Sequence, residues 1–343
     1  MTTQDRAHRT DALGASRRLA ATRLLADLPE LHRAVLAAGL RAPSAHNAQP
    51  WRVRPLSTPD GWRYELHYDH HQYLPADPDD RDAYLCMGAF CETIAMAADR
   101  VGLHADIGLV LTRDDSDLHV ADVTFEPAEP QDALAPYVGG RATNRSVYTS
   151  EQLPSQLVGR LESLGCSLVP TDDAARIVSR ASTLSWRDRR FVADLDAWVR
   201  ADPGSPDGMT PRQLGLARYE WVALKAAFVL GRVRGPLART YGAREVRLMR
   251  DAPAVAVLSA DSDAPADLVD AGRRLLRSWV TICAEGFGYH PISIAIDREE
   301  TRPWVSALSQ ADGTPVAMFR VGRPTAPAAS SNRVDLVDVL VVG

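Results

Sequence analysis

A short motif occurs twice in this chain, and this repeat restricts the possible folds more than any other feature. Residues 98–104 read ADRVGLH and residues 284–290 read AEGFGYH. Each copy ends a long apolar helical pattern and precedes a strand pattern. So short a motif can match by accident, but the shared helix-to-strand context favours an internal duplication that pairs Ala98 with Ala284. We therefore expect two related halves in one chain.

The hydrophobic pattern of the first half predicts both helices and strands. The strands are expected in two hairpins, and the first hairpin turns at TPDG, a sequence that favours a reverse turn. The helices are predicted at 28–40 and 81–101, and the strands at 51–56, 62–68, 105–111 and 118–125. Residues 127–130 read PAEP and indicate a linker.

The second half has the same mixture of elements. Helices are predicted at 154–164, 174–200, 267–286 and 303–309, and strands at 254–259, 292–296 and 316–321. Residues 202–215 are rich in proline and glycine and indicate a loop. We expect an N-terminal arm at 1–27, a first half at 28–130 and a second half at 131–343. Within the second half, residues 198–244 are long enough to form a lid.

Composition excludes several classes of function. The 343 residues carry a net charge of −5, so no basic field favours nucleic acid. The four cysteines form no C-x-x-C pair, and a disulfide framework is not expected in so long a chain. The segment from Met1 to Arg18 lacks the apolar core of a signal peptide, and charges interrupt the apolar helices. We expect a cytoplasmic protein without membrane contact.

The segment from Ala42 to Trp51, which reads APSAHNAQPW, lies between a helical pattern and a strand pattern. Pro43 should end the helix, because its ring disfavours helical angles in the preceding residue. Ser44, Asn47 and Gln49 place donors and acceptors in a compact loop. Many folds contain such polar turns and most of them bind nothing. The ordered combination of residues is what points to a ligand.

This segment resembles the flavin-contacting loop of the nitroreductase family, which typically reads Pro-Ser-x-x-Asn-x-Gln-Pro-Trp. The resemblance implies an α+β fold with a mostly antiparallel sheet flanked by helices in each unit. Family members work as intimate homodimers with flavin in the crevice between subunits. With two halves, the chain resembles the tandem, Acg-like branch, in which the halves form a pseudo-dimer. We expect a monomer of this kind and leave a higher oligomer open.

The second half carries a segment that resembles the family's phosphate motif, Arg-x-Ser-x-Arg/Lys-x-Phe. It reads RATNRSVY, which assigns the phosphate of flavin mononucleotide (FMN) to Arg141, Thr143 and Arg145. Arg333 lies where the family places a last phosphate-binding arginine, and Arg323 is either a further ligand or a solvated surface charge. Guanidinium groups suit phosphate because they donate paired, charged hydrogen bonds.

Both halves are expected at the flavin ring, through Pro43, Ser44, Ala45, Asn47, Pro291, Ile292 and Ser293. The resemblance implies that Asn47 bonds the ring's polar atoms or the ribityl chain. The segment at 291–293 follows the helix that in relatives delivers backbone donors to flavin N5, although the acidic-Gly or Gly-Gly pair common there is missing. Gln49 and Trp51 are expected to be structural.

The two motifs fall on different halves, and neither is repeated on the other half. One complete site can therefore be assembled from the chain, and we expect about one FMN per chain.

Other signals are weaker. His67, Asp69, His70 and His71, or the acidic run at 77–82, could suggest metal ligands. Neighbouring histidines on a strand point to opposite faces, so a solvated loop is favoured and no metal is expected. Gly286-Phe287-Gly288 lacks the third glycine of a dinucleotide fingerprint. Ser44 and His46 lack the strand-to-helix elbow of a nucleophile site.

The leading hypothesis is an FMN-dependent oxidoreductase of nitroreductase type. The resemblance implies hydride transfer from NAD(P)H through flavin to a planar acceptor, such as a quinone or nitroaromatic. No acid–base residue is demanded by this scheme and none is assigned. The alternative is a flavin-binding or sequestering protein whose lid closes the site and permits little or no turnover. A structural protein without flavin is a third possibility.

Overall fold

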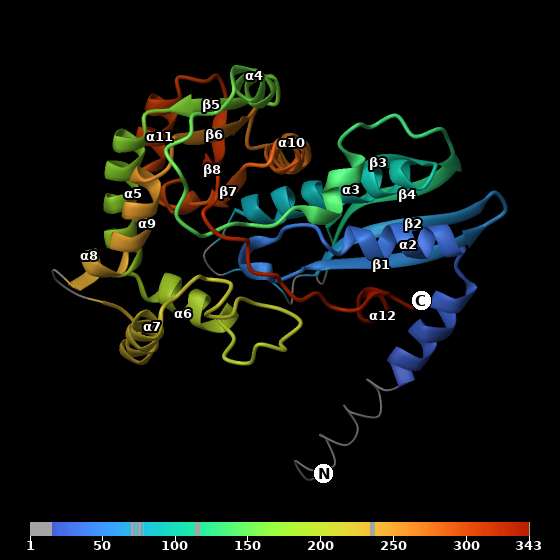
Figure 1. The fold of residues 1–343 in the computed structure, drawn as a ribbon. Helices are drawn as coiled ribbons and strands as arrows, with labels where there is room; N and C mark the ends of the chain where they lie inside the picture. The colour runs from blue at the N-terminus through green and yellow to red at the C-terminus, as the bar shows by residue number, and fades with distance from the viewer. Residues whose placement is uncertain are drawn as a thin grey trace, which may run out of the picture.

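Two four-stranded antiparallel sheets, each flanked by helices, form the α+β fold of this protein (Figure 1). The computed structural model describes residues 16–69, 72, 74, 77, 79–113, 117–233 and 237–342. Two of the histidines weighed as metal ligands, His70 and His71, lie outside the described residues. So do residues 1–15 of the expected arm, whereas residues 16–27 are helical.

The first sheet lies in the first half of the chain and has the strand order β1-β2-β4-β3. Its strands are β1 (Trp51–Thr58), β2 (Gly61–Asp69), β3 (Leu103–Arg113) and β4 (Asp117–Pro127). Two helices accompany them, α2 (Glu30–Gly39) and α3 (Arg81–Arg100). Side chains alternate along β1, where Trp51 and Val53 are buried and Arg52 and Arg54 are not, so one face packs on the core.

The second sheet repeats this topology with the order β5-β6-β8-β7. Its strands are β5 (Cys166–Val169), β6 (Ala254–Ala260), β7 (Gly288–Pro291) and β8 (Thr314–Gly322). Its helices include α4 (Ser155–Ser163), α5 (Thr171–Ser185), α6 (Arg189–Trp198), α7 (Arg218–Leu230), α8 (Leu237–Tyr241), α9 (Ala243–Arg250), α10 (Pro265–Ala284) and α11 (Arg302–Ser309). In both sheets the last strand in sequence pairs with the second and third, and a 20-residue helix joins the second to the third. The shared order supports the expected duplication.

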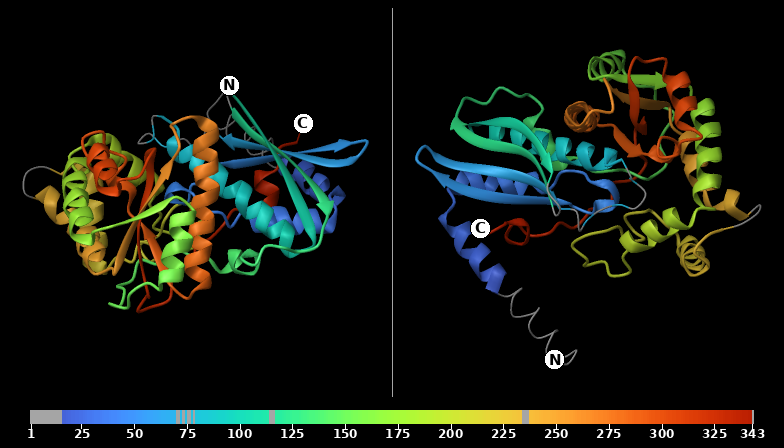
Figure 2. Two further views of the ribbon diagram at one scale, coloured as in Figure 1. Left: turned by 90° about the horizontal axis from the view of Figure 1, so that it is seen from above. Right: turned by 180° about the vertical axis from the view of Figure 1, so that it is seen from behind.

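Those two equivalent helices, α3 and α10, pack against each other between the sheets (Figure 2). A Cβ atom on Gly88 would collide with the backbone carbonyl of Val269, and one on Gly272 would collide with that of Leu85. The two contacts are equivalent, because Gly272 of α10 approaches Leu85 of α3 in the way that Gly88 of α3 approaches Val269 of α10. An interface between two copies of one subunit has the same symmetry. Glycine is required at both positions because any side chain would meet the partner backbone.

The register of the repeat differs from the one that the sequence motif predicted. Both helices span 20 residues, and their starts pair Arg81 with Pro265. Gly102 follows α3 with a φ of 77°, and Gly286 follows α10 with a φ of 75°. These left-handed glycines end equivalent helices, a role for which glycine is suited. The predicted pairing of Ala98 with Ala284 was therefore wrong, because it aligned Gly102 with Gly288 instead.

Three further elements differ from the sequence predictions. The single helix expected at 174–200 is two helices, because the chain turns at Asp188, whose side chain caps α6 by accepting from the amide of Arg190. The strand expected at 292–296 is a 3-10 turn, η4 (Ser293–Ala295), after β7. The short strand β5 was not predicted.

The C-terminal tail returns to the first half. Leu340 forms a parallel bridge with Val53 on β1, and the amide of Val341 donates to the carbonyl of Val53 at 2.8 Å. The short helix α12 (Leu336–Val339) precedes this contact (Figure 1). The second half therefore reaches across the molecule. Within the described ranges, no helix has both the length and the apolar character needed to cross a bilayer.

Replacing Gly88 by alanine should lower the free energy of unfolding by about 1–3 kcal/mol, because the added methyl group collides with the backbone of α10. Urea denaturation followed by circular dichroism measures the change. Gly159→Ala on α4 is the matched control, because nothing lies within 4 Å of its Cβ position. The control should be at least as stable as the native chain. A Gly88→Ala protein of native stability would contradict the proposed contact.

Candidate functional site

A cavity of about 930 Å³ lies between the two halves. Its wall includes residues expected at the flavin from both halves: Pro43, Ser44, Ala45, Thr143, Arg145, Pro291, Ile292 and Ser293. The loop near the start of the chain and the arginine segment that begins at Arg141 therefore face one space. The remaining wall includes parts of the helices α3 and α5 to α10, of β8 and of the segment at 297–300.

The first-half loop has a strained backbone. Its turn η1 (Ala45–Asn47) contains His46 at a φ of 51° and Asn47 at 57°, and Gln49 follows at 54°. Non-glycine residues in the left-handed region cost free energy and persist where surrounding contacts hold them. Ser44 Oγ accepts from the amide of Gln49 at 3.0 Å, and the amide of Ala45 contacts Cys86 Sγ at 3.3 Å. These bonds fix the loop that faces the cavity.

Asn47 has a different role from the one expected. Its Nδ2 donates to the carbonyl of Gly208 at 3.0 Å, and its Oδ1 accepts from Arg333 Nη1 at 2.9 Å. Its amide group thus joins the loop to the segment after α6 and to the C-terminal tail, and it is absent from the cavity wall. Gln49 and Trp51 are structural, as predicted: Gln49 is buried against Pro206, and Trp51 stacks on Phe90.

Arg141 and Arg333 meet beside this loop, although neither lines the cavity. The carbonyl of Arg41 accepts from Arg141 Nη2 at 2.8 Å and from Arg333 Nη2 at 3.3 Å. Arg141 also donates to the hydroxyl of Tyr289. Burial, with the positive charges of Arg141 and Arg41, lowers the pKa of Arg333 to about 10. Buried Arg141 and half-buried Arg333 therefore share one neutral acceptor, the carbonyl of Arg41, behind the loop.

Arg145 is the centre of a second group of cations. It donates to the carbonyl of Gln213 at 3.1 Å, and among the described residues no carboxylate lies within 4 Å of its guanidinium. Burial, with the charge of Arg244, lowers its pKa to about 10. Glu245 also lines the cavity, and burial raises the pKa of its carboxyl group.

Arg320 lies behind the cavity wall and is fully buried on β8. Its Nε faces His290 Nδ1 at 3.2 Å, and its Cζ lies 3.9 Å above the ring of Tyr148. Burial, with the charges of Arg145 and Arg320, holds the pKa of His290 well below its usual value. Arg320 and His290 were not predicted as site residues. An arginine inside an otherwise apolar strand pattern was the available signal.

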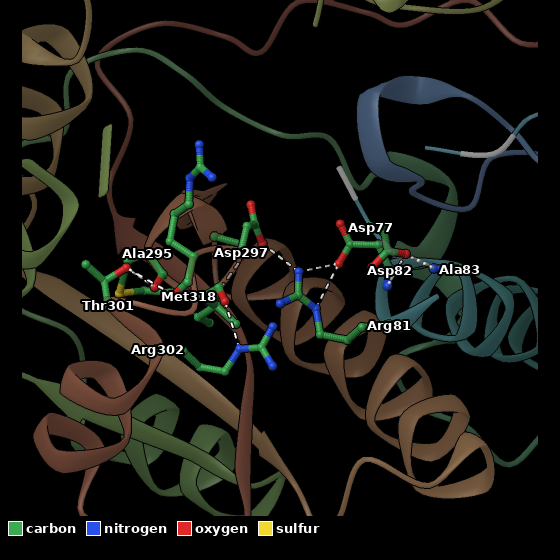
Figure 3. Close-up of polar contacts among 12 residues, drawn as sticks. Asp77, Arg81, Asp82, Ala83, Ala295, Asp297, Thr301, Arg302 and Met318 are labelled. Carbon is green, nitrogen blue, oxygen red and sulfur yellow. Dashed lines mark hydrogen bonds and ion pairs between the residues drawn. The ribbon is translucent and has the colours of Figure 1, made fainter. Parts of the chain in front are cut away.

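Hydrogen bonds to β8 and within the following turn hold the segment at 291–293 (Figure 3). The amide of Ile292 donates to the carbonyl of Met318 at 2.8 Å, and Ser293 Oγ accepts from the amide of Met318 at 3.4 Å. Thr301 Oγ1 donates to the carbonyl of Ala295 at 2.7 Å. The Ile292 amide is thus engaged, so the donor expected here for the flavin edge is not Ile292.

An acidic group lines the opposite part of the cavity. Arg81 at the start of α3 bridges Asp82 at 2.7 Å and Asp297 at 2.5 Å (Figure 3). Asp77 Oδ2 accepts from the amides of Asp82 and Ala83. Burial, with the charge of Asp82, raises the pKa of Asp77, and burial also raises the pKa of Asp297. Three aspartates, Asp77, Asp82 and Asp297, therefore line the cavity close to Arg81.

Arg323 lies away from the cavity. It forms an exposed ion pair with Glu151 at 2.5 Å, and its guanidinium stacks on the ring of Phe287. This arrangement corresponds to the surface-charge alternative, and a role in phosphate binding is not supported.

The segment after α6 forms part of the cavity wall and is a candidate cover for the cavity. Gln49 Nε2 donates to the carbonyl of Pro206 at 2.8 Å, and Asn332 Nδ2 donates to that of Ser205 at 2.8 Å. Its apolar side chains in the wall are Met209, Leu214, Leu216, Tyr219 and Leu224. The first-half loop and the C-terminal tail are therefore hydrogen-bonded directly to this cover.

Outside the cavity, Glu65, His67 and His119 place one ligand atom each within 4.8 Å of one another on the first sheet. Glu65 accepts from Arg54 Nε at 2.6 Å, and His67 faces Asp117 at 3.2 Å. A metal ion would have to displace the arginine from its carboxylate. The group therefore forms an ion-pair network with Arg54 and Asp117.

No family model matches the chain. Rv3131 of Mycobacterium tuberculosis is 28% identical over 308 residues, covering 85% of each chain, and its name provisionally assigns it as an NAD(P)H nitroreductase. PigM of Serratia sp. is 24% identical over 82% of this chain and 85% of its own, and it has a similar provisional name. These relatives support the resemblance to the nitroreductase family.

The solved structures that match include a provisionally named nitroreductase from Anabaena variabilis, which is 12% identical with a TM-score of 0.45 and covers 83% of this chain and 82% of its own. The FMN-dependent nitroreductase NfnB from Mycobacterium smegmatis, in complex with NADPH, is 15% identical with a TM-score of 0.35. It covers 60% of this chain and 95% of its own.

Proposed function

We propose that this protein is an FMN-dependent oxidoreductase of nitroreductase type, built as a pseudo-dimer within one chain. The observation that carries the proposal is the single cavity lined by Pro43–Ala45 of one half and by Thr143 and Arg145 of the other. These are the segments that resemble the ring loop and the phosphate motif of the family. The pseudo-symmetric packing of α3 and α10 supports the tandem arrangement, with halves at 28–130 and 131–343.

The cationic groups fit the phosphate of FMN. Buried arginines without carboxylate partners are unfavourable unless an anion compensates them. Arg320 Nη1 and Arg333 Nε are buried without a hydrogen-bond partner among the described residues, and Arg145 has only neutral acceptors. A phosphate monoester offers several acceptor oxygens and up to two negative charges. We infer that four residues bind the phosphate of FMN or shape the end of the cavity that receives it: Arg141, Thr143, Arg145 and Arg333.

When bound, FMN supplies hydride transfer from a reduced nicotinamide to a second acceptor. The residues of the chain position and shield it. Pro43, Ser44 and Ala45 form one wall, and the segment at 291–293 forms another wall. The cover after α6 limits access of water. The names of Rv3131 and PigM support NAD(P)H as the reductant, and we infer a planar acceptor such as a quinone or nitroaromatic.

A sequestering protein is the second candidate, because the cover is well fastened. The main chain of Asn47 accepts from the amide of Gly208 at 3.1 Å, while its side chain donates back to the same residue. Gln213 Nε2 also donates to the carbonyl of Ser330 at 3.1 Å. A cover that never opens would exclude both nicotinamide and acceptor.

Anaerobic mixing of the yellow protein with NADPH or NADH in a stopped-flow instrument decides between the two functions. An oxidoreductase should lose its visible flavin absorbance within seconds and regain it when menadione is added. A flavin that keeps its colour over many minutes would eliminate the enzyme and favour sequestration. A colourless preparation that takes up no FMN would eliminate both.

Flavin retention should depend on the buried arginines and not on the exposed one. Arg145→Ala and Arg141→Ala should each raise the dissociation constant for FMN by roughly 10- to 100-fold. Arg145 is a charged donor in the cavity wall, whereas Arg141 holds the carbonyl of Arg41 beside the first-half loop. Arg323→Ala is the control, since Arg323 pairs with Glu151 at the surface. Quenching of FMN fluorescence on binding to the apoprotein measures the constants. Equal weakening in all three variants would contradict the assignment.

A further inference from the structure

His46 occupies a special place in the cavity wall. It lies in the first-half loop between Ala45 and Asn47, with a φ of 51° that the loop holds against its intrinsic preference. Its side chain is 27% exposed and lines the cavity together with Pro43 and Ser44. It is thus an ionisable group on the same loop as the residues assigned to the flavin ring. The proposed hydride transfer makes no use of it.

Asp194 on α6 orients the imidazole from the cover. Its Oδ2 lies 3.5 Å from His46 Nε2, and the carboxylate is only 2% exposed. Its Oδ1 is buried without a hydrogen-bond partner among the described residues. A buried carboxylate is unfavourable without a positive partner, and His46 is the cationic side chain that the structure places beside it. The pair therefore gives the protonated imidazole a carboxylate partner inside the cavity.

Asp297 provides a second carboxylate on the same side of the cavity. The charge of His46 acts on Asp297 directly, in addition to the ion pair of Asp297 with Arg81. His46 thus faces Asp194 from α6 and Asp297 from the turn after η4. Because Asp194 engages Nε2, the other nitrogen, Nδ1, is left for a ligand; it has no hydrogen bond within the described part of the chain.

We propose that His46 is the proton donor for the acceptor in this cavity, oriented by Asp194. The inference rests on the proposed oxidoreductase function. Two-electron reduction of a quinone requires a hydride, which the cofactor supplies, and a proton on the quinone oxygen. His46 gives that proton from Nδ1 and becomes neutral imidazole, while the quinone becomes a hydroquinone. A proton taken up from solvent then restores the imidazolium form of His46.

The proposal predicts that loss of His46 slows only the step that needs a proton. Hydride uptake from NADPH needs no external acid, and ferricyanide takes single electrons without protons. His46→Gln should therefore slow reoxidation of the reduced protein by menadione by about 100-fold, the contribution typical of a general acid. Bleaching by NADPH and reoxidation by ferricyanide should change by less than about 3-fold, because neither step uses a general acid. His104→Gln, at an exposed position on β3, is the matched control and should behave like the native protein.

The dependence on pH gives a second readout. Reoxidation by menadione should slow in the native protein as the pH rises, because a general acid must carry its proton to act. His46→Gln should lose this dependence, and Asp194→Asn should weaken it. The groups that face His46 are Asp194, Asp297 and, through Asp297, Arg81.

A structural role for His46 predicts different results. If His46 served only to fasten the cover through Asp194, its loss would release the segment after α6. Trypsin would then cut the flavin-free variant faster at Arg212 or Arg218 than the native chain. The proposal expects cleavage rates within about 2-fold of native in His46→Gln, because the bonds of Asn47 and Gln49 to the cover remain.

Three outcomes would overturn the proposal. His46→Gln could be reoxidised by menadione as fast as the native protein, could lose menadione and ferricyanide reactivity equally, or could show a cover opened to trypsin. Failure of the oxidoreductase function has a separate signature, since NADPH would then not bleach even the native protein, and both proposals would fall together.

Discussion

The contact between Gly88 on α3 and Gly272 on α10 is the constraint on which the rest of the structure depends. At these positions the backbone of each helix occupies the space that a Cβ atom on the other helix would need. The two helices therefore pack in direct backbone contact. Glu92 extends the contact by pairing with Arg273 and Arg277 across the helix boundary. The sheets are thereby fixed on either side, and the loop at 42–51 is brought opposite the arginine segment that starts at Arg141.

The charged side chains around the cavity suit the proposed chemistry. One side of the cavity gathers Arg145, Arg244 and His290, and the other gathers Asp77, Asp82 and Asp297. Arg145 and the arginines behind the wall stay buried without carboxylate partners, which is unfavourable for the protein alone and favourable for a phosphorylated ligand. The acidic side surrounds His46 and Arg81. Arg145, which is proposed for the cofactor phosphate, and His46, the proposed proton donor, therefore line one cavity.

Much of the fold could be predicted because the hydrophobic periodicity of helices and strands can be recognised in contiguous residues. The break at Asp188 and the short strand β5 were missed, since a capping side chain and a short edge strand leave little pattern. The predicted alignment of the two halves was shifted, because the sequence does not show which glycine adopts the left-handed backbone conformation that ends a helix. Site residues within a motif, such as Thr143 and Arg145, reach the cavity as expected.

The rest of the site depends on contacts between distant residues, which a single sequence does not reveal. Arg323 was considered because of its charge, but Glu151, which is far from it in the sequence, satisfies that charge. Asn47 was assigned to the flavin, yet the tail and the cover use its amide. His290, Arg320 and Asp194 come from separate elements and form no linear motif. Their roles follow from their burial and from the contacts that the fold creates among them and with His46, which only the three-dimensional structure shows.

The central claim is that two related halves enclose a single flavin between them. The most direct measurement is the amount of FMN released when the purified, cofactor-saturated protein is denatured, compared with the chain concentration. The account predicts about one FMN per chain, because ring loop and phosphate segment occur once each and face one cavity. A value near two would require a second site at the pseudo-symmetric position and would contradict the account, as would a chain that binds none.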